Sequence, residues 1–260
     1  MRPQLVNIST RALVQTADQV LIGGFVISGT DDKETIIRAL GPSLIKRGVT
    51  GALADPILQL FDANGTLIAE NDNWRDTQQT EIQGTGIPPT NDLESAVFMT
   101  LPPSRYTAVM TGKGGAGGIG MIEVDDLSSS ANAQLANIST RGFVGTGNNV
   151  LIGGFILGGT SANTARIVLR AIGPSLSSAG VSGALQDPTL ELRNGNGALI
   201  AANDNWRDSQ EAVIQSSGLA PVDNRESAIF ALLAAGNYTT IVRGKDGTTG
   251  IALVETYNLQ

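Results

Sequence analysis

The sequence of 260 residues contains neither cysteine nor histidine. The first absence excludes disulfide bridges and thiolate metal sites, and the second excludes His-based catalytic triads and imidazole general bases. Aromatic residues make up only 4% of the chain and charged residues 16%, whereas glycine is abundant, with 32 residues. With 41% hydrophobic residues, this composition is typical of a turn-rich β protein with a buried core.

Basic residues are also scarce. The net charge of −7 argues against nucleic acid as a partner, because a phosphate-binding surface needs clustered Lys and Arg. No apolar run approaches the ~18 residues of a membrane-spanning helix, so the sequence predicts no membrane span. The N-terminal segment, residues 1–11, has no apolar core of the kind found in signal peptides. The lack of oxidisable thiols fits an extracellular or cell-surface location, which we expect for this protein.

The two halves of the chain are copies of one another. The repeated segments are 5–11 with 135–141, 21–25 with 151–155, 38–44 with 170–176, and 51–56 with 183–188. A repeat of about 130 residues has the size of a domain and not of a solenoid unit. We therefore expect two domains, 1–127 and 135–260, joined by a short linker at 128–134. Because the chain begins and ends at repeat boundaries, we expect a two-repeat piece of a longer secreted precursor.

Each copy contains six to eight short segments with the pattern of β-strands. Runs such as 20–29 are rich in β-branched residues and bounded by turn residues. Asn64-Gly65 and Asn196-Gly197 separate pairs of apolar runs, and Asn-Gly favours the positive φ angles of a tight hairpin. We predict an all-β protein with two tandem antiparallel β-sandwich domains of jelly-roll type, each with one or two short helical turns.

The only two tryptophans, Trp74 and Trp206, occupy the same position of a repeated hexapeptide, Asn-Asp-Asn-Trp-Arg-Asp. The hexapeptide lies between a strand and a segment with helical character in both copies. We favour a structural joint in which the indole covers an end of the sandwich, because buried aromatic side chains stabilise small domains strongly. The alternative is an exposed aromatic platform for a ligand.

A short helix is expected directly after the second hexapeptide. Asp208 and Glu211 have the spacing of a capping box, with Asp208 as the N-cap. Gly218 is a plausible end of this helix.

Four acids that recur in both copies are the candidate calcium ligands. They are Asp72, Glu94, Asp204 and Glu226. Calcium takes six to eight oxygen ligands, usually including several carboxylates. Other acids nearby are not repeated: Asp62 becomes Asn194, for example, and Asx turns explain such residues without a metal. We expect no obligatory cofactor, with calcium as the open alternative.

Two further patterns have a structural interpretation. Gly112, Gly114 and Gly117 match the spacing of a dinucleotide-binding fingerprint, but a strand and not a helix follows, so we predict a hairpin loop. Arg38 and Arg170 lie inside apolar strands, where an arginine needs a carboxylate partner. The repeated acids available for this role are Asp55, Asp187, Glu94 and Glu226. We expect structural ion pairs, no catalytic residues and no enzyme activity.

The order of the motifs NISTR, LIGGF, RALGPSL, NDNW and ESA resembles a tandem repeat found in large secreted proteins of environmental bacteria. This resemblance covers essentially the whole chain. The second half of each copy is also similar to bacterial pre-peptidase C-terminal domains, which are jelly-roll modules of secreted enzymes. The resemblance implies an extracellular, non-catalytic module, and it transfers no catalytic residue.

The leading functional hypothesis is a structural or adhesive extracellular protein that self-assembles into a fibre or surface layer. Sandwich edges favour strand addition between subunits. The first strand, residues 4–11, is the expected bridging element, because it follows the linker and could pair with the preceding domain. The alternative is a glycan- or calcium-binding accessory module of a larger secreted enzyme.

Overall fold

The computed structural model describes residues 3–128, 132–159 and 163–259, and it confirms the all-β prediction. The strands of the first copy are β1 (Gln4–Val14), β2 (Leu21–Gly29), β3 (Lys33–Leu40), β4 (Pro56–Phe61), β5 (Leu67–Asn71), β6 (Ser95–Leu101), β7 (Arg105–Gly112) and β8 (Gly118–Asp126). Those of the second copy are β9 (Ala133–Val144), β10 (Leu151–Gly158), β11 (Thr164–Ile172), β12 (Pro188–Asn194), β13 (Leu199–Asn203), β14 (Ser227–Ala234), β15 (Gly236–Gly244) and β16 (Gly250–Leu259). Three short α-helices are α1 (Gln79–Gly84), α2 (Pro174–Ser178) and α3 (Glu211–Ser216).

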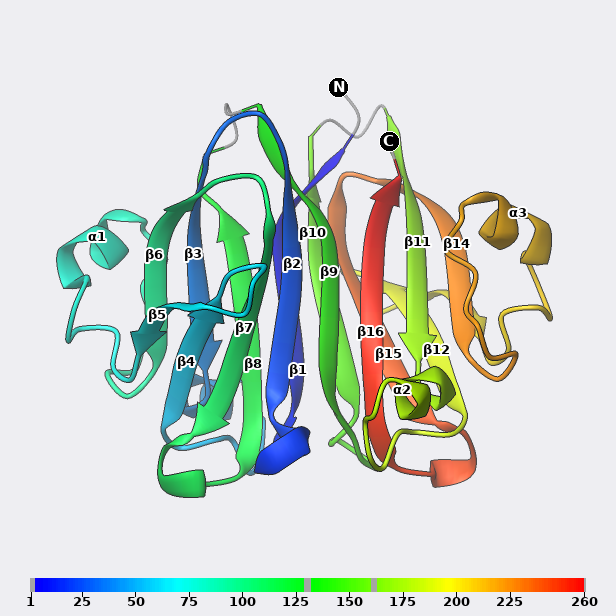
Figure 1. The fold of residues 1–260 in the computed structure, drawn as a ribbon, viewed down its shortest axis with the longest axis horizontal. Coiled ribbons are helices and arrows are strands. Elements are labelled where there is room, and N and C mark those ends of the chain that lie inside the picture. Colours follow the sequence, from blue (N-terminus) through cyan, green and yellow to red (C-terminus); the bar gives the residue numbers. More distant parts are fainter. Residues whose placement is uncertain (1–2, 129–131, 160–162, 260) are drawn as a thin grey trace.

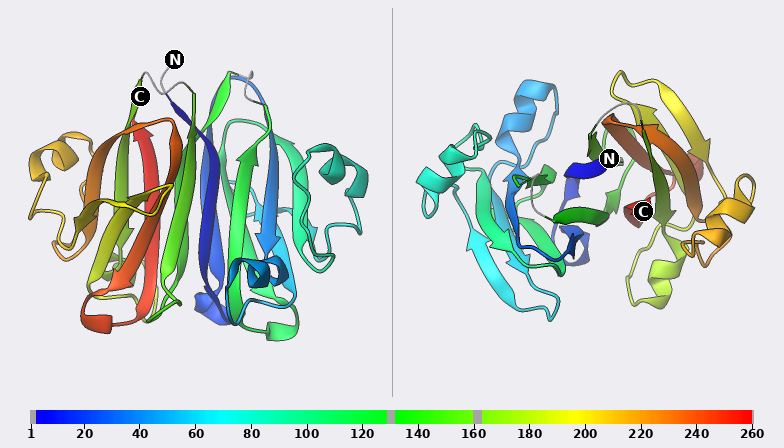
Figure 2. Two further views of the ribbon diagram at one scale, coloured as in Figure 1. Left: turned by 180° about the vertical axis from the view of Figure 1, so that it is seen from behind. Right: turned by 90° about the horizontal axis from the view of Figure 1, so that it is seen from above.

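The strands form two antiparallel layers, and each layer runs through both copies (Figure 1). Layer 1 has the order β6-β3-β8-β1-β10-β15-β12-β13, and layer 2 has the order β14-β11-β16-β9-β2-β7-β4-β5. Parallel bridges between β1 and β9 connect the two layers at the centre. The views in Figure 2 place α1 and α3 at opposite ends of the molecule, far from this junction.

The junction between the copies repeats the same pairing twice. Strand β1 pairs with β10 of the second copy, and β9 pairs with β2 of the first. Ile8 is opposite Phe155, and Ile138 is opposite Phe25, so the two pairings have equivalent registers. At the centre the Thr10 hydroxyl donates a hydrogen bond of 2.9 Å to the Thr140 hydroxyl, and both side chains are buried. The expected bridging by the first strand is thus present within the chain.

The core lies between the layers and extends through both copies. Along β2 the inward positions alternate with outward ones, and Leu21, Phe25 and Ile27 are buried. The ring of Phe25 stacks on that of Tyr106 with a centroid distance of 5.4 Å. The period-two pattern of the sequence therefore positions one face of each strand in a common core.

The two Asn-Gly turns form the predicted hairpins, β4–β5 and β12–β13. In the first, Gly65 has a φ of 78°, which glycine adopts without strain. The Asp62 carboxylate accepts hydrogen bonds from the backbone N–H groups of Asn64 and Thr66, at 2.8 and 2.9 Å. This Asx turn gives Asp62 a structural role, and these bonds lower the pKa of its carboxyl group.

The predicted hairpin loop around Gly112–Gly117 is wrong in its connectivity. Strand β7 pairs with β2 and β4 in layer 2, whereas β8 pairs with β1 and β3 in layer 1. The segment therefore crosses between the layers. Turn residues indicate that the chain changes direction, but they do not determine which layer the next strand joins.

Among the described residues, we find no helix with the length and apolar character needed to cross a membrane.

Candidate functional site

The repeated hexapeptide surrounds a buried indole. Trp74 is 2% exposed and packs against Ile36, Ile82 and Ala96 at the outer side of layer 1. Its indole N–H donates to the backbone oxygen of Asn91 at 3.2 Å. Trp206 is also 2% exposed and packs against Ile214 and Ala228, which are equivalent to Ile82 and Ala96.

Arginine covers each indole from outside. The Arg75 guanidinium lies 4.1 Å from the ring centroid of Trp74, and Arg207 lies 4.3 Å from that of Trp206. Arg75 is held by an ion pair with Asp92, with an N–O distance of 2.6 Å. A covered and buried ring offers no open face for stacking on a sugar, so this geometry favours the structural joint.

Side chains next to the indole block the free edge of β6. The Asn71 side-chain oxygen accepts the backbone N–H of Ala96 at 2.9 Å. The side-chain amide of Gln78 donates to the oxygen of Phe98 at 2.8 Å and accepts its N–H at 3.1 Å. Asn203 and Gln210 make the same bonds to β14. Sequence reasoning missed this role, although the repetition of Asn71 and Gln78 at Asn203 and Gln210 was a signal for it.

The predicted capping box at Asp208 is wrong, because α3 begins only at Glu211. Gln210 has a left-handed conformation with a φ of 51°, and no side chain caps the helix. The Asp208 carboxylate instead accepts a hydrogen bond from the Asn205 amide at 2.8 Å. The expected end of the helix is found: Gly218 has a φ of 74° and donates its N–H to a carbonyl of the last turn.

Glu94 and Glu226, two of the calcium candidates, hold backbone turns. Glu94 is fully buried, and one carboxylate oxygen accepts the N–H groups of Gly41 and Ser43 at 3.0 and 2.9 Å. Glu226 makes the same bonds to Gly173 and Ser175. These carboxylates fix the Gly-Pro turns that follow β3 and β11.

Asp72 and Asp204, the other calcium candidates, bind lysine side chains. The Asp72 carboxylate lies 2.6 Å from the ammonium group of Lys113, and Asp55 lies 3.7 Å from the same group. The hydrogen bond to Asp72 raises the pKa of Lys113. Asp204 contacts Lys245 at 2.7 Å in the second copy. Across the described parts of the chain, no three acidic side chains converge as a metal site would require.

The expected partners of Arg38 and Arg170 are wrong, because the carboxylates come from the adjacent strand in the layer. Arg38 lies 2.8 Å from Glu123 and 3.1 Å from Asp125, both on β8. Arg170 donates to Glu255 on β16 at 2.8 Å. Burial raises the pKa of Glu123, and the charge of Arg38 opposes this shift. The register pairs Arg38 directly with Glu123, and sequence reasoning could not foresee this without knowing the strand order.

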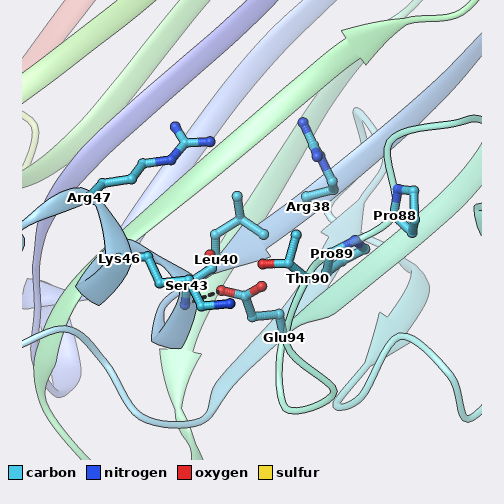
Figure 3. Close-up of a pocket in the computed structure, with 9 residues that line it drawn as sticks. All are labelled: Arg38, Leu40, Ser43, Lys46, Arg47, Pro88, Pro89, Thr90 and Glu94. Atoms are coloured by element: carbon cyan, nitrogen blue, oxygen red, sulfur yellow. Dashed lines mark hydrogen bonds between the residues drawn. The ribbon is translucent and has the colours of Figure 1, made fainter.

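A cavity of about 250 Å³ lies beside this arginine in the first copy (Figure 3). Its lining residues are Arg38, Leu40, Ser43, Lys46, Arg47, Pro88, Pro89, Thr90 and Glu94. Figure 3 shows the guanidinium groups of Arg38 and Arg47 on either side of Leu40. The cavity combines cationic groups, hydroxyl groups and an apolar wall, which is the composition of a small binding site.

A wider groove of about 750 Å³ lies on the outer face of layer 2, where strands of both copies meet. Gly24, Thr107 and Ser139 line it beside Glu255 and Tyr257. The Tyr257 hydroxyl donates to Glu255 at 2.7 Å and accepts a bond from Arg170 at 3.0 Å. Burial and the negative charge of Glu255 raise the pKa of Tyr257 to about 12. Glu255 and Tyr257 in this groove are thus already bonded to each other and to Arg170.

Comparisons with known proteins show neither a matching family nor a matching curated protein. Similar solved structures include the major capsid protein P2 of bacteriophage PM2, with 9% identity and a TM-score of 0.23, over 96% of this chain and 98% of that one. A DUF4785 family protein of Legionella pneumophila has 10% identity and a TM-score of 0.26, over 97% of this chain and 65% of that one. At these TM-scores neither likeness carries a conclusion about function.

Proposed function

We propose that this chain is a non-catalytic, extracellular structural or adhesive protein that self-assembles into a fibre or surface layer. The observation that carries the proposal is the junction between the copies, where β1 pairs with β10 and β9 pairs with β2. Because both layers continue across it, bending at the junction would break two strand pairings. The two copies therefore act as one stiff unit, which suits a load-bearing or spacing role.

The ends of this unit carry most of its exposed apolar side chains. Among the described residues, Leu199, Ile200, Leu232 and Val222 lie on the end strands or adjacent loop of the second copy, and Leu67 and Leu93 lie on those of the first. Leu232 is 60% exposed and Leu199 is 54% exposed. A contact between unlike ends of two chains is heterologous, and repetition of such a contact produces a filament when the rotation does not close a ring.

Contacts between chains would use these ends and not the first strand. β1 has neighbours on both sides, β8 and β10, and its equivalent β9 has β16 and β2. Neither strand has a free edge for a second chain. The expected bridging between chains by residues 4–11 is therefore replaced in our proposal by end-to-end contacts.

Light scattering and negative-stain electron microscopy at micromolar concentration test the proposal. We expect particles longer than one chain, whose number increases with protein concentration. A strictly monomeric particle under all conditions would contradict self-assembly. Adding millimolar calcium tests the alternative of a calcium cofactor separately, because Lys113 already pairs with Asp72 and lies 3.7 Å from Asp55. We expect assembly without calcium.

A second candidate function is an accessory module that binds a glycan. The cavity beside Arg38 favours it, because it contains unpaired cationic groups and hydroxyl groups against an apolar wall. Calorimetric titration with sugars distinguishes this candidate from a purely structural role, because only a binding module should release or absorb heat on binding.

A further inference from the structure

The cavity beside Arg38 concentrates positive charge in an acidic protein. Arg38, Lys46 and Arg47 all line it, although the net charge of the chain is −7. Lys46 and Arg47 are exposed on the turn after β3, and within the described residues no ion pair or side-chain hydrogen bond holds either of them. Lys46 and Arg47 therefore keep their hydrogen-bond donors available for an anion, although the charge of Arg47 also acts on Glu123.

The charged groups of the inner wall of the cavity already have partners. Arg38 is paired with Glu123 and Asp125, and backbone N–H groups hold the carboxylate of Glu94. However, the Nε–H of Arg38 is buried and has no hydrogen-bond partner. A buried donor without a partner is costly, and a ligand oxygen or a water molecule would relieve that cost.

The remaining lining fits the body of a sugar. Leu40, Pro88 and Pro89 contribute apolar surface to the lining, against which a pyranose ring could lie. Ser43 and Thr90 also line the cavity, and their hydroxyls can bond sugar hydroxyls. In the second copy the hydroxyl of Ser175 instead bonds Glu226.

We propose that this cavity binds a carboxylate-bearing sugar of the hexuronic acid class, with its carboxylate between Lys46 and Arg47. Arginine and lysine bind carboxylates by charge-assisted hydrogen bonds, and the apolar wall selects an organic anion over an inorganic one. The cavity has room for about one sugar residue, since larger ligands occupy roughly 300–1,000 Å³. This inference rests on the binding-module candidate and is independent of self-assembly.

The second copy provides a natural control for the site. Ser178 and Ala179 stand where the first copy has Lys46 and Arg47, and Val222 stands in place of Thr90. Glu226 holds the turn of the second copy as Glu94 does in the first, although Arg170 there binds Glu255 and Tyr257. The fold therefore accepts both sets of side chains, and only the first copy should bind.

Calorimetric titration of the full chain with D-glucuronate tests the proposal, with glucose, acetate and sulfate as comparison ligands. We expect one site per chain that prefers glucuronate to all three and weakens as salt is added. The variant Lys46→Ser/Arg47→Ala, which copies the second repeat, should lose at least about tenfold in affinity, equivalent to about 1.4 kcal/mol, with an unchanged melting temperature.

The reciprocal variant Ser178→Lys/Ala179→Arg should gain weak binding at the second copy. Three results would overturn the proposal: no heat with glucuronate, equal affinity for sulfate or acetate, or unchanged affinity in the Lys46→Ser/Arg47→Ala variant. Self-assembly is measured without sugar. The absence of glucuronate binding and the absence of self-assembly are therefore separate results, and either can occur without the other.

Discussion

The side chain of Gln78 takes the place of a missing strand beside Phe98. Its amide donates to the Phe98 carbonyl at 2.8 Å and accepts the Phe98 N–H at 3.1 Å, as a neighbouring backbone would. Gln210 does the same for Phe230. Exposed edge strands pair readily with other chains, so these residues prevent unspecific pairing at β6 and β14.

The first prediction follows from this contact. Gln78→Ala should free both polar groups of Phe98, lower the free energy of unfolding by about 1–2 kcal/mol, and increase aggregation. Chemical denaturation and turbidity on heating measure the two effects. Gln83→Ala, at an exposed position of α1, is the matched control and should behave like the wild type. Equal aggregation of both variants would contradict edge protection.

The second prediction concerns the buried indole. Trp74→Ala should cost about 3–5 kcal/mol of unfolding free energy, because it removes a large side chain from the contact with Ile36, Ile82 and Ala96. Arg75→Ala removes an exposed ion pair and the guanidinium that covers the indole, and should cost only about 1 kcal/mol. If the Trp74→Ala protein unfolds like its parent but loses sugar binding, the result would favour the alternative hypothesis that the indole is a ligand platform.

The third prediction tests a buried ion pair that the second copy lacks. The ammonium group of Lys33 lies 2.7 Å from Asp126, and both side chains are almost fully buried. Lys33→Ala should cost about 3–5 kcal/mol because it leaves a buried carboxylate unpaired.

The corresponding residues of the second copy are Ala165 and Asn258. The double variant Lys33→Ala/Asp126→Asn reproduces that pair and should recover most of the loss, as measured by urea unfolding. If the double variant is no more stable than Lys33→Ala, the unpaired carboxylate of Asp126 is not the cause of the stability lost in Lys33→Ala.

The sequence predicted much of the local structure. Strand alternation and the Asn64-Gly65 turn depend on neighbouring residues, so the pattern was sufficient to place the strands and the hairpin. The pairing of Ile8 with Phe155 was harder to foresee, because it joins residues far apart in the sequence. The expectation that the first strand bridges the copies came from its position after the linker and not from its pattern.

The errors in the candidate sites have one cause. Arg38 was expected to pair with a repeated acid, but its partner Glu123 is determined by the order of β3 and β8 in layer 1. The predicted capping box at Asp208 does not form. The side chain of Gln210 bonds the backbone of Phe230, and the backbone of Gln210 is left-handed, so the helix begins only after it. In both cases contacts between distant segments outweighed a local pattern.

The fourth prediction is a dependence on alkaline pH. The pKa of Tyr257 is raised from 10.0 to about 12, first by burial and then by the charge of Glu255. The folded state therefore favours the neutral phenol, and its contribution to stability is complete below pH 10 and is lost as the pH rises through 12.

Burial also raises the pKa of Tyr106 and Tyr238, so absorbance titration of tyrosinate should show Tyr257 as the last of the three tyrosines to titrate. Tyr257→Phe should remove that late step. Persistence of the step in this variant would assign it to another tyrosine and contradict the raised pKa of Tyr257.

The fifth prediction concerns the apolar ends. Lysine at positions 199 and 232 places two charges on the end of the second copy, where the wild type exposes leucine. Leu199→Lys/Leu232→Lys should therefore prevent association between chains, because the loss of apolar area and the cost of burying two charged groups both oppose the contact. Ile45→Lys is the matched control, since Ile45 is 64% exposed but lies on the turn after β3, away from the end strands.

Sedimentation velocity over a range of protein concentrations tests the central claim of end-to-end self-assembly most directly. The account predicts that the wild type and Ile45→Lys sediment faster as concentration rises, whereas Leu199→Lys/Leu232→Lys stays monomeric. A wild-type protein that is monomeric throughout, or an end variant that assembles like the wild type, would contradict it.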